Sequence, residues 1–201
     1  MRGSSVPKPP SSDDEGFKTQ LIGLIPHLRA FARTLTGDAT AADDLAQDAM
    51  VKAWDARASY QMGTNMKAWT FMILRNQFYS EKRRSWRQSQ LDQEAAERTL
   101  VAVDDPEAPV ALDELRMALN TLPIEQREAL ILVGAGGFAY EEAARICQCA
   151  VGTVKSRVSR ARKSLLGILE SGGYARDGRA AGDAMRSILA DADRLSGPLR
   201  G

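Results

Sequence analysis

Residues that carry acid–base, nucleophilic or metal chemistry are scarce in this 201-residue chain. It has one histidine, His27, expected on a helix surface, and two cysteines, Cys147 and Cys149. A Cys-x-Cys pair in a helical turn cannot close an unstrained disulfide, and no second cysteine or histidine pair completes a metal site. Residues 134–137 lack the lysine of a P-loop, and no Ser/His/Asp set is evident. We therefore expect no catalytic residue, no metal and no cofactor. Both cysteines are expected to be small buried apolar residues of a protein in a reducing compartment.

Long apolar segments are also missing. The longest uncharged run, residues 129–140, is too short and too rich in glycine to cross a bilayer. Residues 1–16 are rich in proline, serine and aspartate, which indicates a disordered N-terminus rather than a signal peptide. We expect a cytoplasmic protein that does not bind a membrane.

Net charge is small, +1 at pH 7, which argues against a simple nucleic-acid coat. The charges are nevertheless unevenly distributed. Residues 66–87 contain six cations and one acid, whereas residues 88–114 contain eight acids and one arginine. A second basic region follows near residues 155–163. Two basic regions separated by an acidic one suggest two separate contacts with a polyanion.

Strand-like alternation is absent, and helical periodicity recurs instead. We predict an all-α fold of two small helical domains, residues 17–87 and 110–170. An acidic flexible linker, residues 88–109, joins them, and a tail follows at 171–201, where residues 185–195 fit one short amphipathic helix. In the first domain we predict helices over 17–35, 38–57 and 66–87. Pro26 should kink or break the first of them near Ile25. In the second we predict helices over 110–121 and 124–134, followed by a helix pair.

That helix pair, residues 140–163, is the most informative stretch. Val151, Val154, Val158 and Ala161 recur at helical spacing, while residues 150–166 hold five cations and no acid. A helix with small apolar residues, a tight turn and a cationic helix are together typical of a helix-turn-helix whose second helix enters the DNA major groove. The alternative is a solvated basic helix in an ordinary bundle.

Four segments carry a family resemblance: residues 43–54, 68–76, 122–130 and 152–157. These segments resemble motifs of the sigma factors of bacterial RNA polymerase, specifically the compact extracytoplasmic-function group. The order of the segments, their spacing and the linker between them all fit that group, and the resemblance covers residues 17–169. Residues 71–80 and 143–152 further resemble the alphaproteobacterial general stress branch. The resemblance implies a promoter-specificity subunit, which is a binding protein and not an enzyme.

For the second domain, the resemblance implies docking of the recognition helix at the minus-thirty-five element. Arg157 and Arg160 lie one helical turn apart, a spacing suited to bidentate contacts with guanine edges. The remaining polar residues are expected to anchor phosphates: Thr153, Lys155, Ser156, Arg162 and Lys163.

For the first domain, the resemblance implies binding and melting of the minus-ten element. Unstacked bases need aromatic faces near cations. We expect Tyr60 and the loop through Asn65 to form a base pocket. The strand would then follow Arg75, Asn76, Tyr79, Lys82, Arg83 and Trp86. Trp69, with apolar flanks, is instead expected in the core.

The core polymerase enzyme should bind the polar outer face of residues 38–57, because acids there would repel DNA. The residues expected to form this face are Asp44, Gln47, Asp48, Lys52 and Trp54. Without the resemblance, simple solvation explains the acidic face equally well, and Trp54 fits either the core or the polymerase contact.

Three positions depart from the wider family. Ala139 and Ala150 occupy positions where many members have a capping serine, and so each forgoes a cap worth about 1 kcal/mol. Gln148 occupies a turn position often held by glycine, which predicts a strained left-handed backbone. These departures indicate a marginal domain that partner binding would steady.

The partners implied by the resemblance are core RNA polymerase, promoter DNA and a small helical anti-sigma protein like NepR. Two other functions fit the residues less well. A stand-alone helix-turn-helix regulator has no use for the second basic region. A sigma-mimicking regulator that binds an anti-sigma protein usually lacks the basic recognition surface.

Overall fold

The computed structural model describes residues 12–91 and 110–170. The first domain comprises α1 (Ser12–Gly23), α2 (Ile25–Thr36), α3 (Ala39–Asp55), the short 3₁₀ helix η1 (Arg57–Ser59) and α4 (Met66–Leu91). The second comprises α5 (Val110–Asn120), α6 (Ile124–Gly134), α7 (Tyr140–Cys147) and α8 (Val151–Glu170). No strand occurs within these ranges, and the predicted all-α class is confirmed. The predicted linker and C-terminal helix lie almost entirely outside the described residues.

Two predicted boundaries were wrong. Residues 12–16, expected to be disordered, form the start of α1, and α4 continues past Arg87 to Leu91. Both added segments are strongly polar, so apolar periodicity gave no signal for them. The predicted break near Ile25 is confirmed, since α1 ends at Gly23 and α2 begins at Ile25. Pro26 lies in the first turn of α2, where its missing N–H leaves no helical hydrogen bond unmade.

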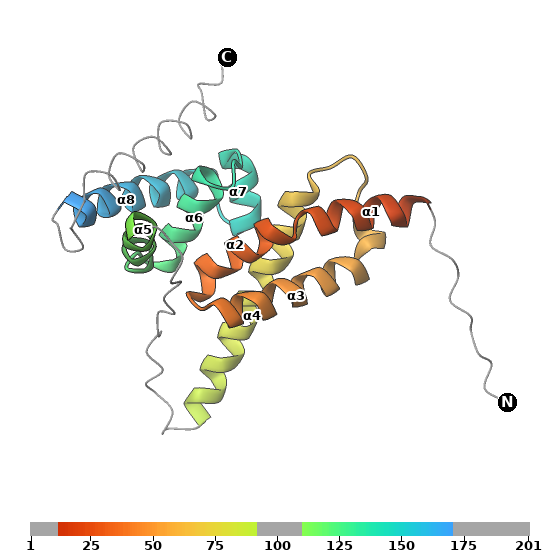
Figure 1. Ribbon diagram of the computed structural model, residues 1–201, viewed down its shortest axis with the longest axis horizontal. Helices are drawn as coiled ribbons and strands as arrows, with labels where there is room; N and C mark the ends of the chain where they lie inside the picture. Colours follow the sequence, from red (N-terminus) through yellow and green to blue (C-terminus); the bar gives the residue numbers. More distant parts are fainter. Residues whose placement is uncertain (1–11, 92–109, 171–201) are drawn as a thin grey trace, which may run out of the picture.

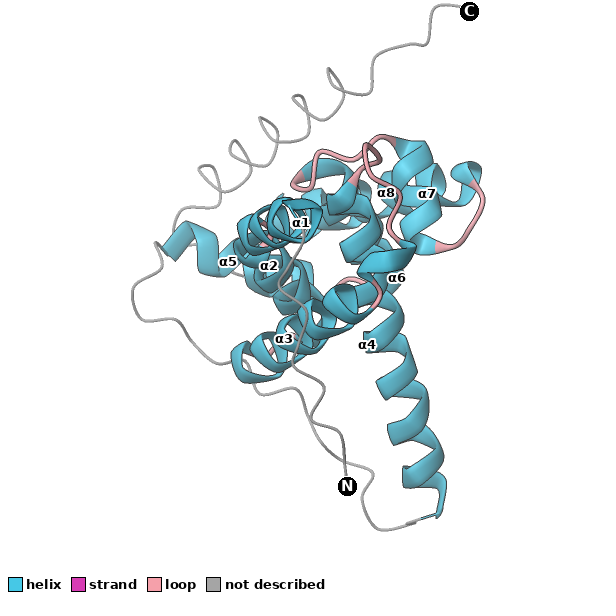
Figure 2. Cartoon of the chain, turned by 90° about the vertical axis from the view of Figure 1, so that its right-hand side faces the viewer, coloured by secondary structure: helices cyan, strands magenta, loops and turns pink. Residues whose placement is uncertain are grey.

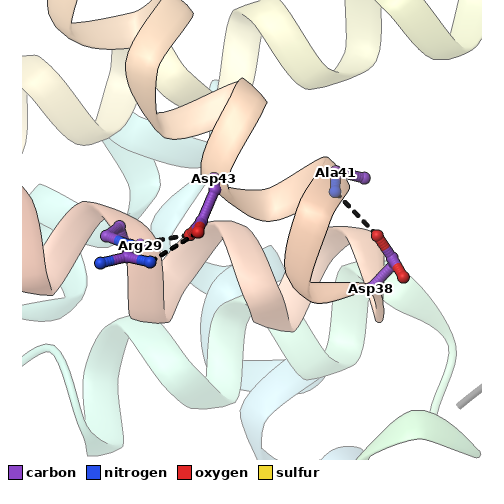
Figure 3. A network of polar contacts seen from close by, with 4 residues as sticks. All are labelled: Arg29, Asp38, Ala41 and Asp43. Atoms are coloured by element: carbon purple, nitrogen blue, oxygen red, sulfur yellow. Dashed lines mark hydrogen bonds and ion pairs between the residues drawn. The ribbon is translucent and has the colours of Figure 1, made fainter. Parts of the chain in front are cut away.

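The junction between α2 and α3 has a local explanation in the residues at its ends. Gly37 adopts a left-handed conformation (φ 74°) and donates its N–H to the Arg33 carbonyl, which ends α2. Asp38 then caps α3 by accepting a hydrogen bond from the Ala41 N–H at 2.7 Å (Figure 3). Arg29 donates two hydrogen bonds to Asp43, and these lower the pKa of that exposed carboxyl.

The two domains are packed against each other rather than held apart, as Figure 1 shows for α2 beside α6. One continuous apolar core includes Leu28 and Leu74 from the first domain and Leu132 and Val158 from the second. Figure 2 shows the C-terminal part of α4 extending away from this body. Among the described helices, none has the length and apolarity needed to cross a membrane.

Candidate nucleic-acid interface

The second helix of the helix-turn-helix, α8, has an apolar face and a cationic face. Val154, Val158, Ala161 and Leu165 are buried against α6 and α7. The predicted DNA-binding residues lie elsewhere on the helix. Thr153, Lys155, Arg160 and Lys163 are exposed, and Ser156, Arg157 and Arg162 are half-buried. The helix therefore presents Lys155, Arg160 and Lys163 to solvent, whereas Arg157 and Arg162 lie partly against the rest of the protein.

Some of the α8 side chains have local partners. Arg157 lies against the turn, with its Nη1 3.8 Å from the Cys149 Sγ. Ser156 donates its hydroxyl proton to the Thr153 carbonyl at 2.9 Å, so this hydroxyl is engaged within the helix. Arg160 is the exposed member of the arginine pair proposed to read bases.

The turn before α8 has the strain that the sequence predicts. Gln148 is the single non-glycine residue with positive φ (52°) among the described residues. It ends α7 by donating its N–H to carbonyls of the preceding turn. Ala139, at the start of α7, makes no side-chain cap, although Glu142 accepts a hydrogen bond from its N–H at 3.1 Å. Burial raises the pKa of the Cys147 thiol to about 12, as expected of an inert core cysteine.

The predicted base pocket corresponds to a cavity of about 290 Å³. Tyr60, Asn65 and Trp69 line it, and so do Arg145 and Ile146 from α7. Tyr60 is only 8% exposed, because its ring packs against Phe17 and Trp69 and its hydroxyl donates to the Thr64 carbonyl at 2.6 Å. Trp69 is half-buried, so it both joins this aromatic cluster and lines the cavity.

The promoter-strand residues predicted along α4 divide into two groups. Asn76, Lys82, Arg83 and Trp86 are exposed, the last at 63%. Arg75 and Tyr79 instead contact the second domain, and so does Asn65, which precedes α4 and was predicted in the base pocket. Asn65 donates to Glu142 at 2.7 Å, and its other amide atom accepts the Ala68 N–H at the start of α4.

Arg75 and Tyr79 meet an acid that sequence reasoning missed. Glu128, on α6, is fully buried, with its two oxygens 2.5 Å from Arg75 Nε and 3.2 Å from the Tyr79 hydroxyl. Burial raises the pKa of Glu128, and Arg75 opposes that shift. The sequence did offer one signal of an unusual acid, because Glu128 directly precedes the apolar part of α6. That position does not reveal a partner in another domain.

The predicted polymerase-binding face lies along the outside of α3. Asp44, Gln47, Asp48 and Lys52 are exposed, whereas Trp54 is half-buried beneath Arg57, whose guanidinium carbon is 4.6 Å from the ring centre. Gln77 of α4 was not predicted to belong to this face. It links two of the face's residues, because its side-chain oxygen accepts a hydrogen bond from Lys52 and its side-chain nitrogen lies 3.5 Å from an Asp48 carboxylate oxygen. In the described part of the chain, no group of His, Cys, Asp or Glu side chains is placed to hold a metal ion.

Comparison with known proteins identifies both domains. Residues 23–88 match sigma-70 region 2, and residues 112–165 match sigma-70 region 4. The chain is 46% identical over 155 residues to the ECF RNA polymerase sigma factor EcfG of Rhodopseudomonas palustris, which spans 77% of this chain and 86% of that protein.

Two solved structures share the fold. The sigma factor RpoE of Bartonella quintana, in complex with the anti-sigma factor NepR, is 46% identical with a TM-score of 0.71. The match covers 78% of this chain and 98% of the RpoE chain. CnrH, in complex with the cytosolic domain of CnrY, is 24% identical with a TM-score of 0.58, and the match covers 80% of this chain and 91% of the CnrH chain. The two matched regions, their order and the relatives agree: the chain belongs to the ECF sigma factors of RNA polymerase, which are transcription initiation factors and not enzymes.

Proposed function

We propose that this chain directs core RNA polymerase to stress-response promoters in the cytoplasm, under the control of a small helical anti-sigma protein. The observation that carries the proposal is the presence of both sigma regions on one chain, each with a solvent-facing cationic helix surface. A stand-alone regulator needs only one such surface, and a mimic of a sigma factor needs neither.

In this proposal α8 lies in the major groove at the minus-thirty-five element. Arg157 and Arg160 reach guanine edges, because bidentate donors match the two acceptors that guanine presents there. The exposed Lys155 and Lys163 neutralise phosphates and fix the register of the helix.

The first domain acts at the minus-ten element. A base leaving the duplex needs a pocket with an aromatic wall and a nearby cation, and the cavity beside Tyr60 and Trp69 has both, since Arg145 also lines it. The exposed cations Lys82 and Arg83 and the ring of Trp86 then continue the path of the strand along α4.

Control by an anti-sigma protein is supported by the groove between the domains. A cavity of about 740 Å³ is lined by apolar residues of both, including Leu35, Phe78, Leu122 and Ile124. Arg127 is 6% exposed in its wall, and its Nε has no hydrogen-bond partner among the described residues. Such a groove fits an amphipathic helix that carries an acid. The related RpoE structure contains the anti-sigma factor NepR.

The test is in vitro transcription with purified core polymerase on a library of promoter fragments. The proposal expects transcripts from a defined subset of promoters only when the factor is present. A factor that binds promoter DNA without core enzyme and yields no transcript would identify a stand-alone regulator instead.

A pull-down tests the inhibitor. The factor is first loaded with a NepR-like protein, and core enzyme is then added. Competition for shared surface predicts that core and inhibitor exclude each other. A stable complex of all three proteins would rule out this mode of inhibition.

A further inference from the structure

A second, smaller apolar cluster lies beside the cavity that we propose as the base pocket, and it is distinct from the core that the two domains share. Its buried members come from α1, from α3 and from both ends of the loop 61–65: they are Phe17, Leu21, Ala53, Tyr60 and Met66. Tyr60 directly precedes this loop and Met66 directly follows it. The cluster therefore fixes the two points between which the loop of the pocket runs.

Phe17 of α1 contacts the aromatic residues that line the cavity. It is 3% exposed, and its ring meets the rings of Tyr60 and Trp69 edge-on, with centroids 5.6 and 6.1 Å away. Those two rings contact each other at 5.2 Å. All three separations lie in the range in which tilted or edge-on aromatic pairs attract each other. Since Tyr60 and Trp69 both line the cavity, Phe17 supports its aromatic wall.

The loop itself is tied to the Tyr60 ring that Phe17 contacts. The Tyr60 hydroxyl donates to the Thr64 carbonyl at 2.6 Å. Thr64 in turn donates its N–H and its hydroxyl to the Gln61 carbonyl, at 3.2 and 2.7 Å. A change in the tilt of the Tyr60 ring must therefore move Thr64 or break the bond to it. Because Gln61 and Thr64 also line the cavity, either result alters the shape of the cavity.

A polar contact holds the start of α1 against the same part of the domain. Arg57 Nε lies 3.1 Å from an Asp14 carboxylate oxygen, and Arg57 Nη1 donates to the Trp54 carbonyl at 3.0 Å. Asp14 and Phe17 both precede residues 23–88, the part of the chain that matches sigma-70 region 2. The support of the cavity wall thus comes from a segment outside that match.

We propose that Phe17 is a positioning residue for minus-ten recognition, acting through Tyr60 and Trp69 to hold the pocket in the shape that accepts an unstacked base. Asp14 has a smaller share, since its ion pair with Arg57 fixes α1 where Phe17 reaches those rings. The inference rests on the proposed function in taking the cavity as the base pocket. Such a site needs support from behind, because a wall that has to be ordered when the base arrives lowers the affinity for that base.

The first experiment compares Phe17→Leu with Phe31→Leu in the full chain. Phe31 is 2% exposed and stacks on Phe71 with centroids 4.8 Å apart, so the same substitution there removes a ring contact of the shared core and none of the pocket. Holoenzyme is reconstituted with each variant, and promoters randomised in the minus-ten element are sequenced before and after binding. Phe17→Leu should reduce preference at one minus-ten position roughly 2- to 12-fold, the equivalent of one aromatic pair, without changing the upstream preference.

Phe31→Leu should lower the melting temperature by a similar amount and leave the minus-ten preference unchanged. That contrast separates positioning of the pocket from a general loss of stability. An equal change of minus-ten preference in Phe31→Leu would attribute the effect to stability and overturn the inference.

A second pair of variants, Asp14→Asn and Glu15→Gln, tests the inference even if Phe17→Leu does not fold. Each removes one negative charge from α1, but Asp14 is paired with Arg57 whereas Glu15 is exposed. Asp14→Asn should reduce the same minus-ten preference, by less than Phe17→Leu, and Glu15→Gln should match the wild type. An unchanged preference in a folded Phe17→Leu overturns the inference. If that variant does not fold, an unchanged preference in Asp14→Asn does so.

Asn65→Ser separates failure of the inference from failure of the proposed pocket. Asn65 lines the cavity, and its side-chain oxygen accepts the Ala68 N–H, a cap that serine also provides. An altered minus-ten preference in Asn65→Ser beside an unchanged one in Phe17→Leu would show that the pocket reads a base without help from α1. Unchanged preferences in both variants would show that the cavity is not the base pocket, and that part of the proposed function would fail together with the inference.

Discussion

The two arginines of α8 allow a sharp test of how the recognition helix reads DNA. Arg160 is exposed and Arg157 is half-buried, and neither lies in the apolar face that packs on the second domain. Replacing Arg160 with alanine therefore removes a DNA contact without disturbing the core. A bidentate contact with guanine is worth about 1–3 kcal/mol, which corresponds to a roughly 5- to 150-fold loss of preference at one upstream position.

Lys163 should behave differently because it is expected to contact a phosphate. Lys163→Ala should weaken binding to all upstream sequences alike and lessen the dependence of log K on log salt by about 0.9. Ser164→Ala, at an exposed neutral position of the same helix, is the matched control. The comparison separates base reading from charge.

The assay is selection from promoters randomised in the upstream element, using holoenzyme reconstituted with each variant and sequencing of the bound fraction. Arg157→Ala needs a parallel check of helical content, because Arg157 also contacts Cys149. If both arginine variants select the same upstream sequence as the wild type, α8 is not placed in the groove as proposed.

Three further perturbations test other parts of the molecule. Reversing charge at Asp44 and Asp48 should weaken core binding, measured by competition with labelled wild type, without changing helical content, because both residues are exposed; normal affinity would exclude this face. Ala139→Ser should raise the free energy of unfolding by about 1 kcal/mol, because its hydroxyl completes the cap that Glu142 already begins; an unchanged urea midpoint would contradict this. Cys147, with its raised pKa of about 12, should resist alkylation at pH 8 until the chain is denatured, as mass spectrometry would reveal; rapid native labelling would refute its burial.

The elements that local sequence predicts well are those in which local chemistry decides the conformation. Periodicity located the helices, and Pro26 located the break before α2; both depend on residues within a few positions of one another. The positive φ of Gln148 was instead expected from the family resemblance, which places this residue at a turn position often held by glycine. The cavity proposed as the base pocket is only partly local, because Tyr60 and Asn65 flank a loop with Gly63 at φ 86°, whereas Arg145 and Ile146 of α7 line its other side.

The contact between the domains could not be predicted in the same way. Glu128 and Arg75 are 53 positions apart, and each lies on a helix whose pattern is complete without the other. An acid in the second turn of a helix is ordinarily a solvated residue, because a glutamate is almost never fully buried unless it is paired. Its burial arises only when a second domain covers it, which is a property of tertiary packing and not of α6.

The closed arrangement, in which the two domains pack against each other, has a consequence for the order in which partners bind. It covers Arg75 and Tyr79 on α4 but leaves Asp44 and Asp48 exposed on the outside of α3. Core polymerase therefore finds its proposed surface free on the closed chain, whereas the promoter strand finds only the exposed Asn76, Lys82, Arg83 and Trp86 of its proposed path. We predict that the free factor binds a minus-ten strand weakly and that added core enzyme tightens this binding, since docking of both domains on the enzyme separates Glu128 from Arg75. Anisotropy of a strand taken from a promoter selected by the holoenzyme measures both states. In Glu128→Gln the free factor should already bind more tightly, so core enzyme should increase its affinity less. Equal strand affinity of the wild-type factor with and without core enzyme would show that α4 is already accessible, and the ordered pathway would be wrong.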